Sequence, residues 1–253
     1  MLTINNLSVH YRQTLALDGA TLTIDPRRIV GIIGPNGAGK STLIKAILEL
    51  VPSTGTVTYE GRPLKSQLRR VAYIPQRTAV DWDYPATVHD VVMMGRCVHI
   101  GWLRWASATD RKLVVEALER VGMEGFAERQ IGELSGGQQQ RVFIARALAQ
   151  QADLLFFDEP FVGVDQTTEA IIFQIFAQLR DQGKTLLVVN HDLGEAVSHY
   201  DDILLMRNRV VAFGPRAEVF NDTNLGLAYG SGAIGRVLSG LPTTGMSSLP
   251  GDP

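Results

Sequence analysis

The residues best suited to chemistry in this sequence form a glycine-rich stretch between a predicted buried strand and a predicted helix. Gly34, Gly39, Lys40 and Ser41 match the spacing G-x-x-x-x-G-K-[ST] of the P-loop. Glycines let backbone N–H groups turn inward and hold phosphate oxygens. A helix that begins near Gly39 directs its positive dipole end toward the same phosphates. The alternative is a simple glycine turn with a solvated lysine.

Two side chains of the loop have specific expected roles. Lys40 would reach the β- and γ-phosphates of ATP, and the Ser41 hydroxyl would bind Mg²⁺. The loop residues expected to contact the nucleotide are Gly34, Pro35, Asn36, Gly37, Ala38, Gly39, Lys40, Ser41 and Thr42.

A pair of acids follows a second buried strand. Asp158 and Glu159 come directly after the apolar run 154–157. An acid in this position, opposite the P-loop, would hold Mg²⁺ directly or through water. A second carboxylate beside it can act as general base on the attacking water. The alternative is a strand that ends in two solvated acids, and the P-loop upstream favours the catalytic interpretation.

A second glycine-containing helix start lies at residues 134–138. Ser135 and Gln138 have the spacing of a capping box. Gly136 and Gly137 leave the N–H groups of the first turn open to an anion. Taken alone, the segment is a well-capped helix that runs to about Ala149. Beside a P-loop, it is a second phosphate-ready helix start in a chain with only one lysine-bearing loop.

The elements that position these residues follow an α/β pattern. Apolar and polar residues alternate over residues 1–24, which favours antiparallel strands with one buried face. Strands are expected at 55–61, 71–74, 154–157 and 185–190, and a hairpin turned at Asn208 is expected at 203–206 and 210–213. A helix is expected across about 168–180, and Pro215 begins a last short one. The sequence predicts an α/β P-loop NTPase core with an N-terminal antiparallel β-subdomain.

Residues 77 to about 145 interrupt this alternation and predict a helical insertion subdomain. Two capping boxes are expected, at Thr87 with Asp90 and at Ser107 with Asp110. Their helices would end at Gly95 and at Gly122.

Large apolar side chains crowd residues 80–105 of this insertion. They are Trp82, Tyr84, Met93, Met94, Trp102 and Trp105. In one interpretation they form the small core of the insertion. In the other, some of them face outward and dock a cytoplasmic helix of a membrane partner, because interfaces are enriched in aromatic residues and Met. The sequence leaves both interpretations open.

Composition limits the remaining function classes. The chain has 253 residues, a net charge of −2 and one cysteine, Cys97. It therefore shows no basic surface for nucleic acid, forms no internal disulfide and fits a reducing compartment. We expect no signal peptide and no membrane span, so any membrane role must come through a partner.

Residues 1–228 are expected to form the ATPase domain. Residues 229–253, which are rich in Gly, Ser, Thr and Pro, are expected to form a flexible tail.

Together these motifs resemble the ATP-binding subunit of an ABC transporter over about residues 2–222. The signature sequence of that family is matched in full by Leu134-Ser135-Gly136-Gly137-Gln138, at its usual distance before the acid pair. The resemblance is specific because six ordered motifs agree. One departure is Val164, which stands where the family usually has leucine, and this conservative change casts no doubt on Asp165.

The resemblance implies a role for each remaining motif residue. Tyr11 would stack on the base, and Gln76 would sense Mg²⁺ and the permease. Asp158 would be the acid that binds Mg²⁺, and Glu159 would be the catalytic base. Asp165 would be the aspartate at the dimer seam, and His191 would be the switch histidine at the γ-phosphate.

The resemblance also implies partners. ATP would lie between the P-loop of one subunit and residues 135–138 of a second copy, in a head-to-tail dimer. The dimer would sit on an integral membrane permease at the cytoplasmic face of the inner membrane, and would act indirectly with a solute-binding protein. In a two-fold dimer, each phosphate site could be closed by the open helix start of the partner chain.

A narrower resemblance covers residues 75–96. This stretch looks like the ATPases of bacterial manganese, zinc and iron importers, and chelated-iron importers have a similar layout. A soluble ABC ATPase acting on nucleic acid or ribosomes is a further alternative, but such proteins usually carry two cassettes or a long coiled-coil insertion. Cys97 and His99 are too few ligands for a closed metal site.

Overall fold

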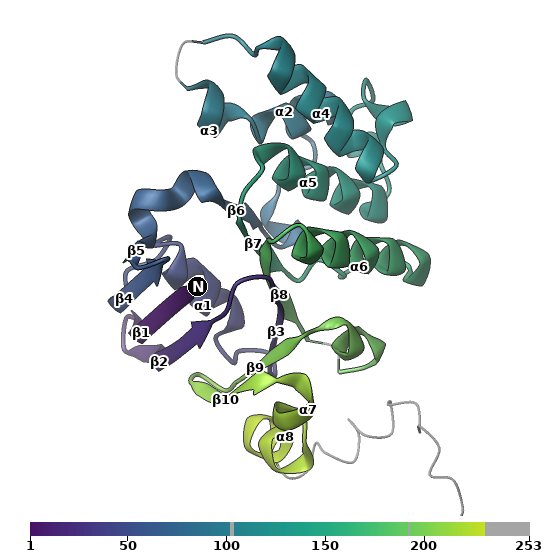
Figure 1. The fold of residues 1–253 in the computed structure, drawn as a ribbon. Helices are drawn as coiled ribbons and strands as arrows, with labels where there is room; N and C mark the ends of the chain where they lie inside the picture. The colour runs from purple at the N-terminus through teal and green to yellow at the C-terminus, as the bar shows by residue number, and fades with distance from the viewer. Residues whose placement is uncertain (102–103, 192, 231–253) are drawn as a thin grey trace, which may run out of the picture.

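The structure is a computed structural model, and it describes residues 1–101, 104–191 and 193–230. Its strands form two sheets, a four-stranded sheet in the order β2-β1-β4-β5 and a six-stranded sheet in the order β10-β9-β3-β8-β7-β6. Figure 1 shows the four-stranded sheet beside the larger one, with helices α2 and α4 stacked above α5 and α6. The predicted fold class is confirmed.

The four-stranded sheet is the predicted antiparallel subdomain. It consists of β1 (Leu2–Tyr11), β2 (Thr14–Ile24), β4 (Thr54–Tyr59) and β5 (Arg62–Pro63). Leu2, Ile4, Leu7 and Val9 of β1 are all buried, whereas residues between them are partly or fully exposed. The alternation in the sequence therefore corresponds to one buried face, as expected for an antiparallel sheet.

The six-stranded sheet has a parallel centre. Its strands are β3 (Ile29–Ile33), β6 (Val71–Ile74), β7 (Leu154–Asp158), β8 (Thr185–Asn190), β9 (Asp202–Met206) and β10 (Val210–Pro215). Neighbouring strands are parallel except for β9 and β10, which form the predicted hairpin. Strands β3, β7 and β8 are buried along their whole length, because helices and the second sheet cover both faces. Burying each such aliphatic side chain contributes about 1.5–3 kcal/mol.

The carboxyl ends of the parallel strands meet at one edge of the sheet. Ile33 of β3 pairs with Asn190 of β8, and Asp158 of β7 pairs with Val189. The residues that follow these strands are therefore brought to the same edge, which is where open α/β sheets bind their ligands.

Two helices cover the faces of this sheet. Helix α1 (Lys40–Ile47) buries its apolar side chains in a core shared with the antiparallel sheet, and α6 (Gln166–Asp181) buries its own in the core on the other face. The chain then continues after β10 through α7 (Arg216–Val219) and α8 (Asp222–Tyr229). The sequence predicted one short helix here, and α8 was missed.

The helical insertion is present and consists of α2 (Val88–Met94), α3 (Cys97–Ile100), α4 (Ala108–Arg120) and α5 (Gly136–Gln150). Both predicted capping boxes are formed. Arg96 donates to Asp110 over 2.9 Å and to the carbonyl oxygen of Ala149 over 2.8 Å, so that one buried guanidinium joins three helices. Short 3₁₀ helices lie at Leu64–Arg70, Arg77–Ala79, Glu124–Phe126, Ile131–Glu133 and Glu195–His199.

The apolar stretch 80–105 is partly buried and partly exposed to solvent. Trp82 is half-buried and its ring lies 5.1 Å from that of Phe143 on α5. Tyr84 and Trp105 face solvent, with exposed fractions of 59% and 96%. Trp102 lies outside the described residues, as does the predicted tail except for residues 229 and 230. The stretch therefore supplies both core and surface.

Candidate functional site

The P-loop lies where the sequence placed it, between the carboxyl end of β3 and the start of α1. Gly39 precedes the helix with a left-handed φ of 86°, a conformation that glycine adopts without a Cβ clash. Lys40 is only 5% exposed, and its Nζ donates to the carbonyl oxygens of Gly34 and Pro35 over 2.7 and 3.0 Å. Burial lowers the pKa of Lys40, and the nearby carboxylates act against this shift. The loop thus holds Lys40, its one cationic side chain, against its own backbone carbonyls.

The Ser41 hydroxyl and the Asp158 carboxylate meet beside this loop. Ser41 Oγ donates to Asp158 Oδ1 over 2.7 Å, and Tyr73 Oη donates to the other carboxylate oxygen over 3.4 Å. Asp158 is buried, and burial raises its pKa. A hydroxyl and a carboxylate oxygen that converge next to a phosphate loop form a donor set that suits a hard cation such as Mg²⁺.

Gln76 and Glu159 are also brought together, although 83 residues separate them in the sequence. Gln76 Nε2 donates to Glu159 Oε2 over 2.5 Å. Glu159 has a left-handed φ of 53°, which is uncommon for a residue with a side chain. The turn after β7 therefore places Asp158 at the loop and Glu159 against Gln76.

His191 and Tyr11 lie at the margins of the same region. His191 directly follows Asn190, the residue of β8 that pairs with the end of β3, and its side chain is exposed. Tyr11 is 44% exposed at the end of β1. On the neighbouring strand, the carbonyl oxygen of Ala16 would lie 2.6 Å from a Cβ at Gly39, so this end of the sheet borders the P-loop.

The second helix start forms a separate group. Ser135 caps α5 in a capping box with Gln138, with Ser135 N donating to Gln138 Oε1 over 2.9 Å. Asp165 caps α6 and accepts from the backbone N–H of Thr168 over 3.0 Å. A Cβ at Gly137 would lie 3.2 Å from the Thr168 side chain. The residues 135–138 and the Asp165 loop therefore lie side by side, as one surface.

One supporting residue of the P-loop was missed from the sequence. Asn208, in the β9–β10 turn, donates its backbone N–H to the carbonyl oxygen of Ala38 over 2.8 Å and its side-chain Nδ2 to those of Gly37 and Ala16, each over 3.3 Å. These bonds tie the β9–β10 turn to the P-loop and to β2. The only sequence signal was an asparagine at a turn, with the left-handed φ of 57° that asparagine tolerates.

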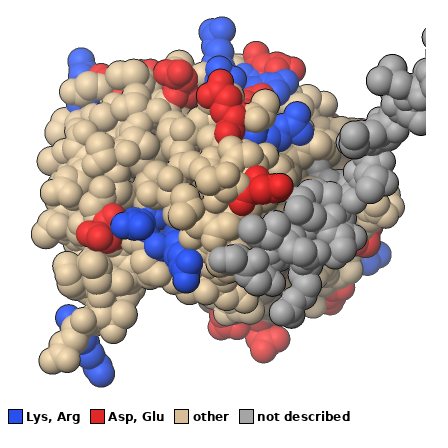
Figure 2. All heavy atoms as spheres, turned by 90° about the horizontal axis from the view of Figure 1, so that it is seen from below, with Lys and Arg blue, Asp and Glu red and all other residues tan. Residues whose placement is uncertain are grey.

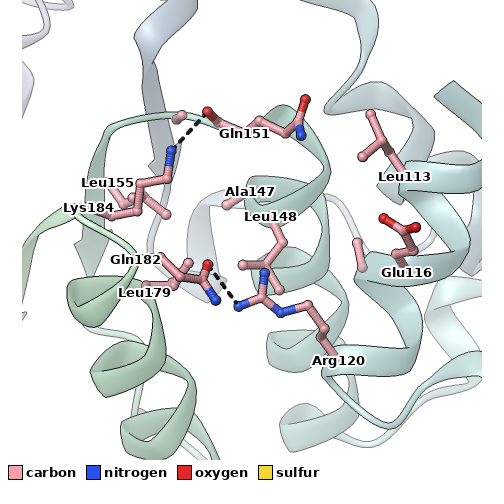
Figure 3. A pocket seen from close by; sticks show the side chains of 12 residues that line it. Leu113, Glu116, Arg120, Ala147, Leu148, Gln151, Leu155, Leu179, Gln182 and Lys184 are labelled. Carbon is pink, nitrogen blue, oxygen red and sulfur yellow. Dashed lines mark hydrogen bonds between the residues drawn. The ribbon is translucent and has the colours of Figure 1, made fainter. Parts of the chain in front are cut away.

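A hollow of about 170 Å³ lies apart from these groups, between α4, α5 and α6. Figure 3 shows Arg120 donating to Gln182 across it, over 3.4 Å, and Lys184 donating to the carbonyl oxygen of Gln151, over 3.4 Å. None of the residues expected to contact nucleotide lines this hollow.

Figure 2 shows basic and acidic side chains interspersed on the described part of the face seen from below, rather than one broad basic area.

The fold and the loop define an α/β nucleotide-binding domain of the P-loop type. Residues 17–162 match the family model for the ABC transporter. The chain belongs to this family. Among the described residues, no helix has the length and apolar character needed to cross a membrane.

Relatives with similar sequences carry transport names. The chain is 50% identical over 226 residues to a manganese transport system ATP-binding protein of Halalkalibacterium halodurans, covering 89% of this chain and 90% of the relative. It is 49% identical over 239 residues to a zinc transport system ATP-binding protein of Treponema pallidum, covering 94% and 88%.

Solved structures agree with the fold. A dimeric bacterial ABC transporter cassette superposes with a TM-score of 0.75 at 28% identity, covering 85% of this chain and 99% of that one. The ATP-binding subunit of another ABC transporter gives a TM-score of 0.75 at 26% identity, covering 90% and 94%.

Proposed function

We propose that this chain is the ATP-hydrolysing subunit of a membrane importer for a divalent metal ion such as manganese or zinc. The observation that carries the enzymatic part is the convergence of Lys40, Ser41, Asp158 and Glu159 at one sheet edge. The manganese and zinc relatives, about half identical over nearly the whole chain, support the cargo.

In this proposal the P-loop binds the phosphates of ATP. Backbone N–H groups of residues 34–42 donate to phosphate oxygens, and Lys40 exchanges the carbonyls of Gly34 and Pro35 for the β- and γ-phosphates. Ser41, Asp158 and Gln76 would hold the Mg²⁺ of Mg-ATP, which neutralises phosphate charge when it is bound. Tyr11 stacks on the base.

Hydrolysis then requires a water in line with the γ-phosphate. Glu159 accepts the proton of that water as general base. Gln76, hydrogen-bonded to Glu159, orients the carboxylate, and His191 contacts the γ-phosphate from the end of β8. These groups contribute by position and charge, since phosphoryl transfer needs little covalent chemistry from the protein.

A second copy of the chain would complete each site. Residues 135–138 form a helix start that is partly open to solvent, and Asp165 is exposed beside it. In a head-to-tail dimer this surface would close over the ATP bound to the partner's P-loop. The solved relative that is itself a dimeric cassette supports this arrangement.

An integral membrane permease would bind the dimer at the cytoplasmic face and respond to its closure over ATP. A solute-binding protein would be an indirect partner. The exposed side chains of Tyr84, Met94 and Trp105 support a docking surface on the helical insertion, because isolated aromatic anchors carry much of the energy of an interface. Nucleic acid has no place in this proposal.

The cargo is tested in cells that lack the gene for this chain. We expect manganese or zinc uptake, measured with radioactive tracers, to fall in the deletion strain and to return with the wild-type gene. The Glu159→Gln variant is the matched control, and it should not restore uptake. If manganese and zinc uptake are unchanged and uptake of chelated iron is lost, the transported substrate is chelated iron rather than a free divalent ion. Unchanged uptake of all three would contradict the importer proposal.

A further inference from the structure

Two consecutive residues of the loop after β6 send their side chains to different places. Gln76 contacts Glu159, the proposed general base at the chain's own P-loop. Arg77 instead donates through Nε and Nη2 to the side-chain oxygen of Gln139 on α5, over 3.1 and 2.9 Å. Gln139 is 3% exposed, so this forked contact is shielded from water. The loop therefore joins the P-loop group to the start of α5.

The Arg77 guanidinium fills the space beside the α5 start. A Cβ built on Gly136 would lie 3.0 Å from Arg77 Nη1, and one on Gly163 would lie 3.6 Å from the same atom. The same Cβ on Gly136 would lie 3.2 Å from the carbonyl oxygen of Gly163. Arg77 thus lies against both parts of the proposed dimer surface, residues 135–138 and the loop that leads to Asp165.

Trp82 fixes the other end of this short segment to the same helix. Its Nε1 donates to the carbonyl oxygen of Arg77 over 2.9 Å, and its ring packs on Phe143 of α5. The Arg77 guanidinium carbon lies 5.7 Å from the centre of the Trp82 ring. Residues 77–82 are therefore held to α5 at two points, and the exposed Tyr84 follows two residues after Trp82.

We propose that Arg77 is a positioning residue that sets the helix start at 135–138, and the Asp165 loop beside it, relative to Gln76. This inference rests on the head-to-tail dimer of the proposed function. In that dimer, Gln76 contacts the catalytic centre of its own chain, whereas residues 135–138 close the site of the partner. Arg77 then couples the two ATP sites, because a shift of one loop moves both surfaces.

The test compares Arg77→Ala with Arg120→Ala. Arg120 is a matched control because it also donates to a glutamine side-chain oxygen, that of Gln182, but far from the proposed sites. We expect Arg77→Ala to weaken ATP-driven dimerisation about tenfold when dimerisation is measured in the Glu159→Gln background. In the protein that retains Glu159 and hydrolyses ATP, Arg77→Ala should bring the Hill coefficient of hydrolysis close to one. ATP affinity of the monomer and the melting temperature should stay close to those of Arg120→Ala.

A second variant keeps the charge. Arg77→Lys cannot form the two-pronged contact with Gln139, so it should also lose cooperativity, even if Arg77→Ala folds poorly. Wild-type cooperativity and dimerisation in a folded Arg77→Lys or Arg77→Ala protein would overturn the inference while leaving the proposed function intact. If the Glu159→Gln protein itself forms no ATP-driven dimer, the dimer proposal and the inference both fall.

Discussion

The two helix starts that we propose to contact ATP phosphates are built differently. Helix α1 begins at Gly39 with no side-chain cap, beside a buried Lys40 and the Ser41–Asp158 contact. Helix α5 has an exposed N-cap residue, Ser135, that forms a complete capping box. The α1 start has a cation and, beside it, hydroxyl and carboxylate oxygens of the kind that Mg²⁺ of an ATP complex prefers.

The α5 start offers backbone N–H groups and a serine hydroxyl, and its immediate neighbour is the Asp165 loop. Such a surface can complete an anion site, and its neighbouring cation, Arg77, is hydrogen-bonded to Gln139. In the proposed dimer, this difference makes α1 the binding site within one chain and α5 a half-site whose other half lies on the partner.

The largest effect is expected for Glu159→Gln, which removes the proposed base and leaves both helix starts unchanged. An amide cannot accept the proton of water, so turnover should fall by about 10³-fold while ATP binding persists. Phosphate release measures the first quantity, and size exclusion with ATP and Mg²⁺ should show an accumulated dimer. A variant that stays monomeric and turns over normally would contradict both roles.

Lys40→Ala breaks the α1 site directly. Loss of the cation that faces two phosphates should weaken ATP binding by about 10²-fold, as measured by fluorescence titration. Lys65→Ala is the control, since Lys65 forms an exposed ion pair with Glu49. Equal affinity in the two variants would refute the P-loop assignment.

Ser135→Arg breaks the α5 half-site and spares the other. A bulky cation at the exposed cap should reduce hydrolysis by at least about tenfold, because it obstructs closure over the partner's ATP. Ser107→Arg removes a capping box of the same kind on α4 and serves as control for helix capping alone. Parallel loss of ATP binding by the Ser135→Arg monomer would show that Ser135 serves only local folding.

His191→Ala tests the margin of the α1 site. We expect turnover to fall by several-fold to about tenfold with a smaller effect on affinity, because the side chain contacts only the γ-phosphate in this proposal. ATP and ADP titrations separate the two effects, since ADP affinity should not change. Wild-type turnover would make His191 an ordinary loop histidine.

The smallest effect is expected for Asn208→Gly. Glycine keeps the left-handed turn and the backbone bond to Ala38, and it removes only the side-chain bonds to Gly37 and Ala16. ATP affinity should fall about threefold, in line with the modest net energy of such bonds. Unchanged affinity would mean that the backbone contact alone positions the loop.

Much of this architecture could be predicted because its signals are local. The capping boxes at 87–90, 107–110 and 135–138 each need only two side chains three residues apart. The fully apolar runs that became β7 and β8 need only burial on both faces.

What the sequence could not show depends on contacts between distant segments. Asn208 reaches the P-loop across 171 residues, and Arg77 reaches Gln139 across 62. Neither contact leaves a periodic pattern. Helix α8 was missed because its buried residues, Leu225 and Ala228, are few and its composition is rich in polar and small residues. Whether a given aromatic of the insertion faced inward also depended on packing, as Trp82 and Trp105 show.

The central claim, that each ATP site is shared between two chains, is tested most directly by mixing two defective variants. In the Glu159→Gln background, Lys40→Ala chains are combined with Ser135→Arg chains. A head-to-tail pair then retains one intact site, made from the P-loop of one chain and the helix start of the other. We predict an ATP-dependent dimer that holds one ATP, although neither variant forms such a dimer alone. In a second mixture, a chain that carries both Lys40→Ala and Ser135→Arg is combined with the Glu159→Gln parent, and this mixture should contain no mixed dimer. Absence of the ATP-holding mixed dimer in the first mixture, or equal formation of a mixed dimer in the second, would contradict the account.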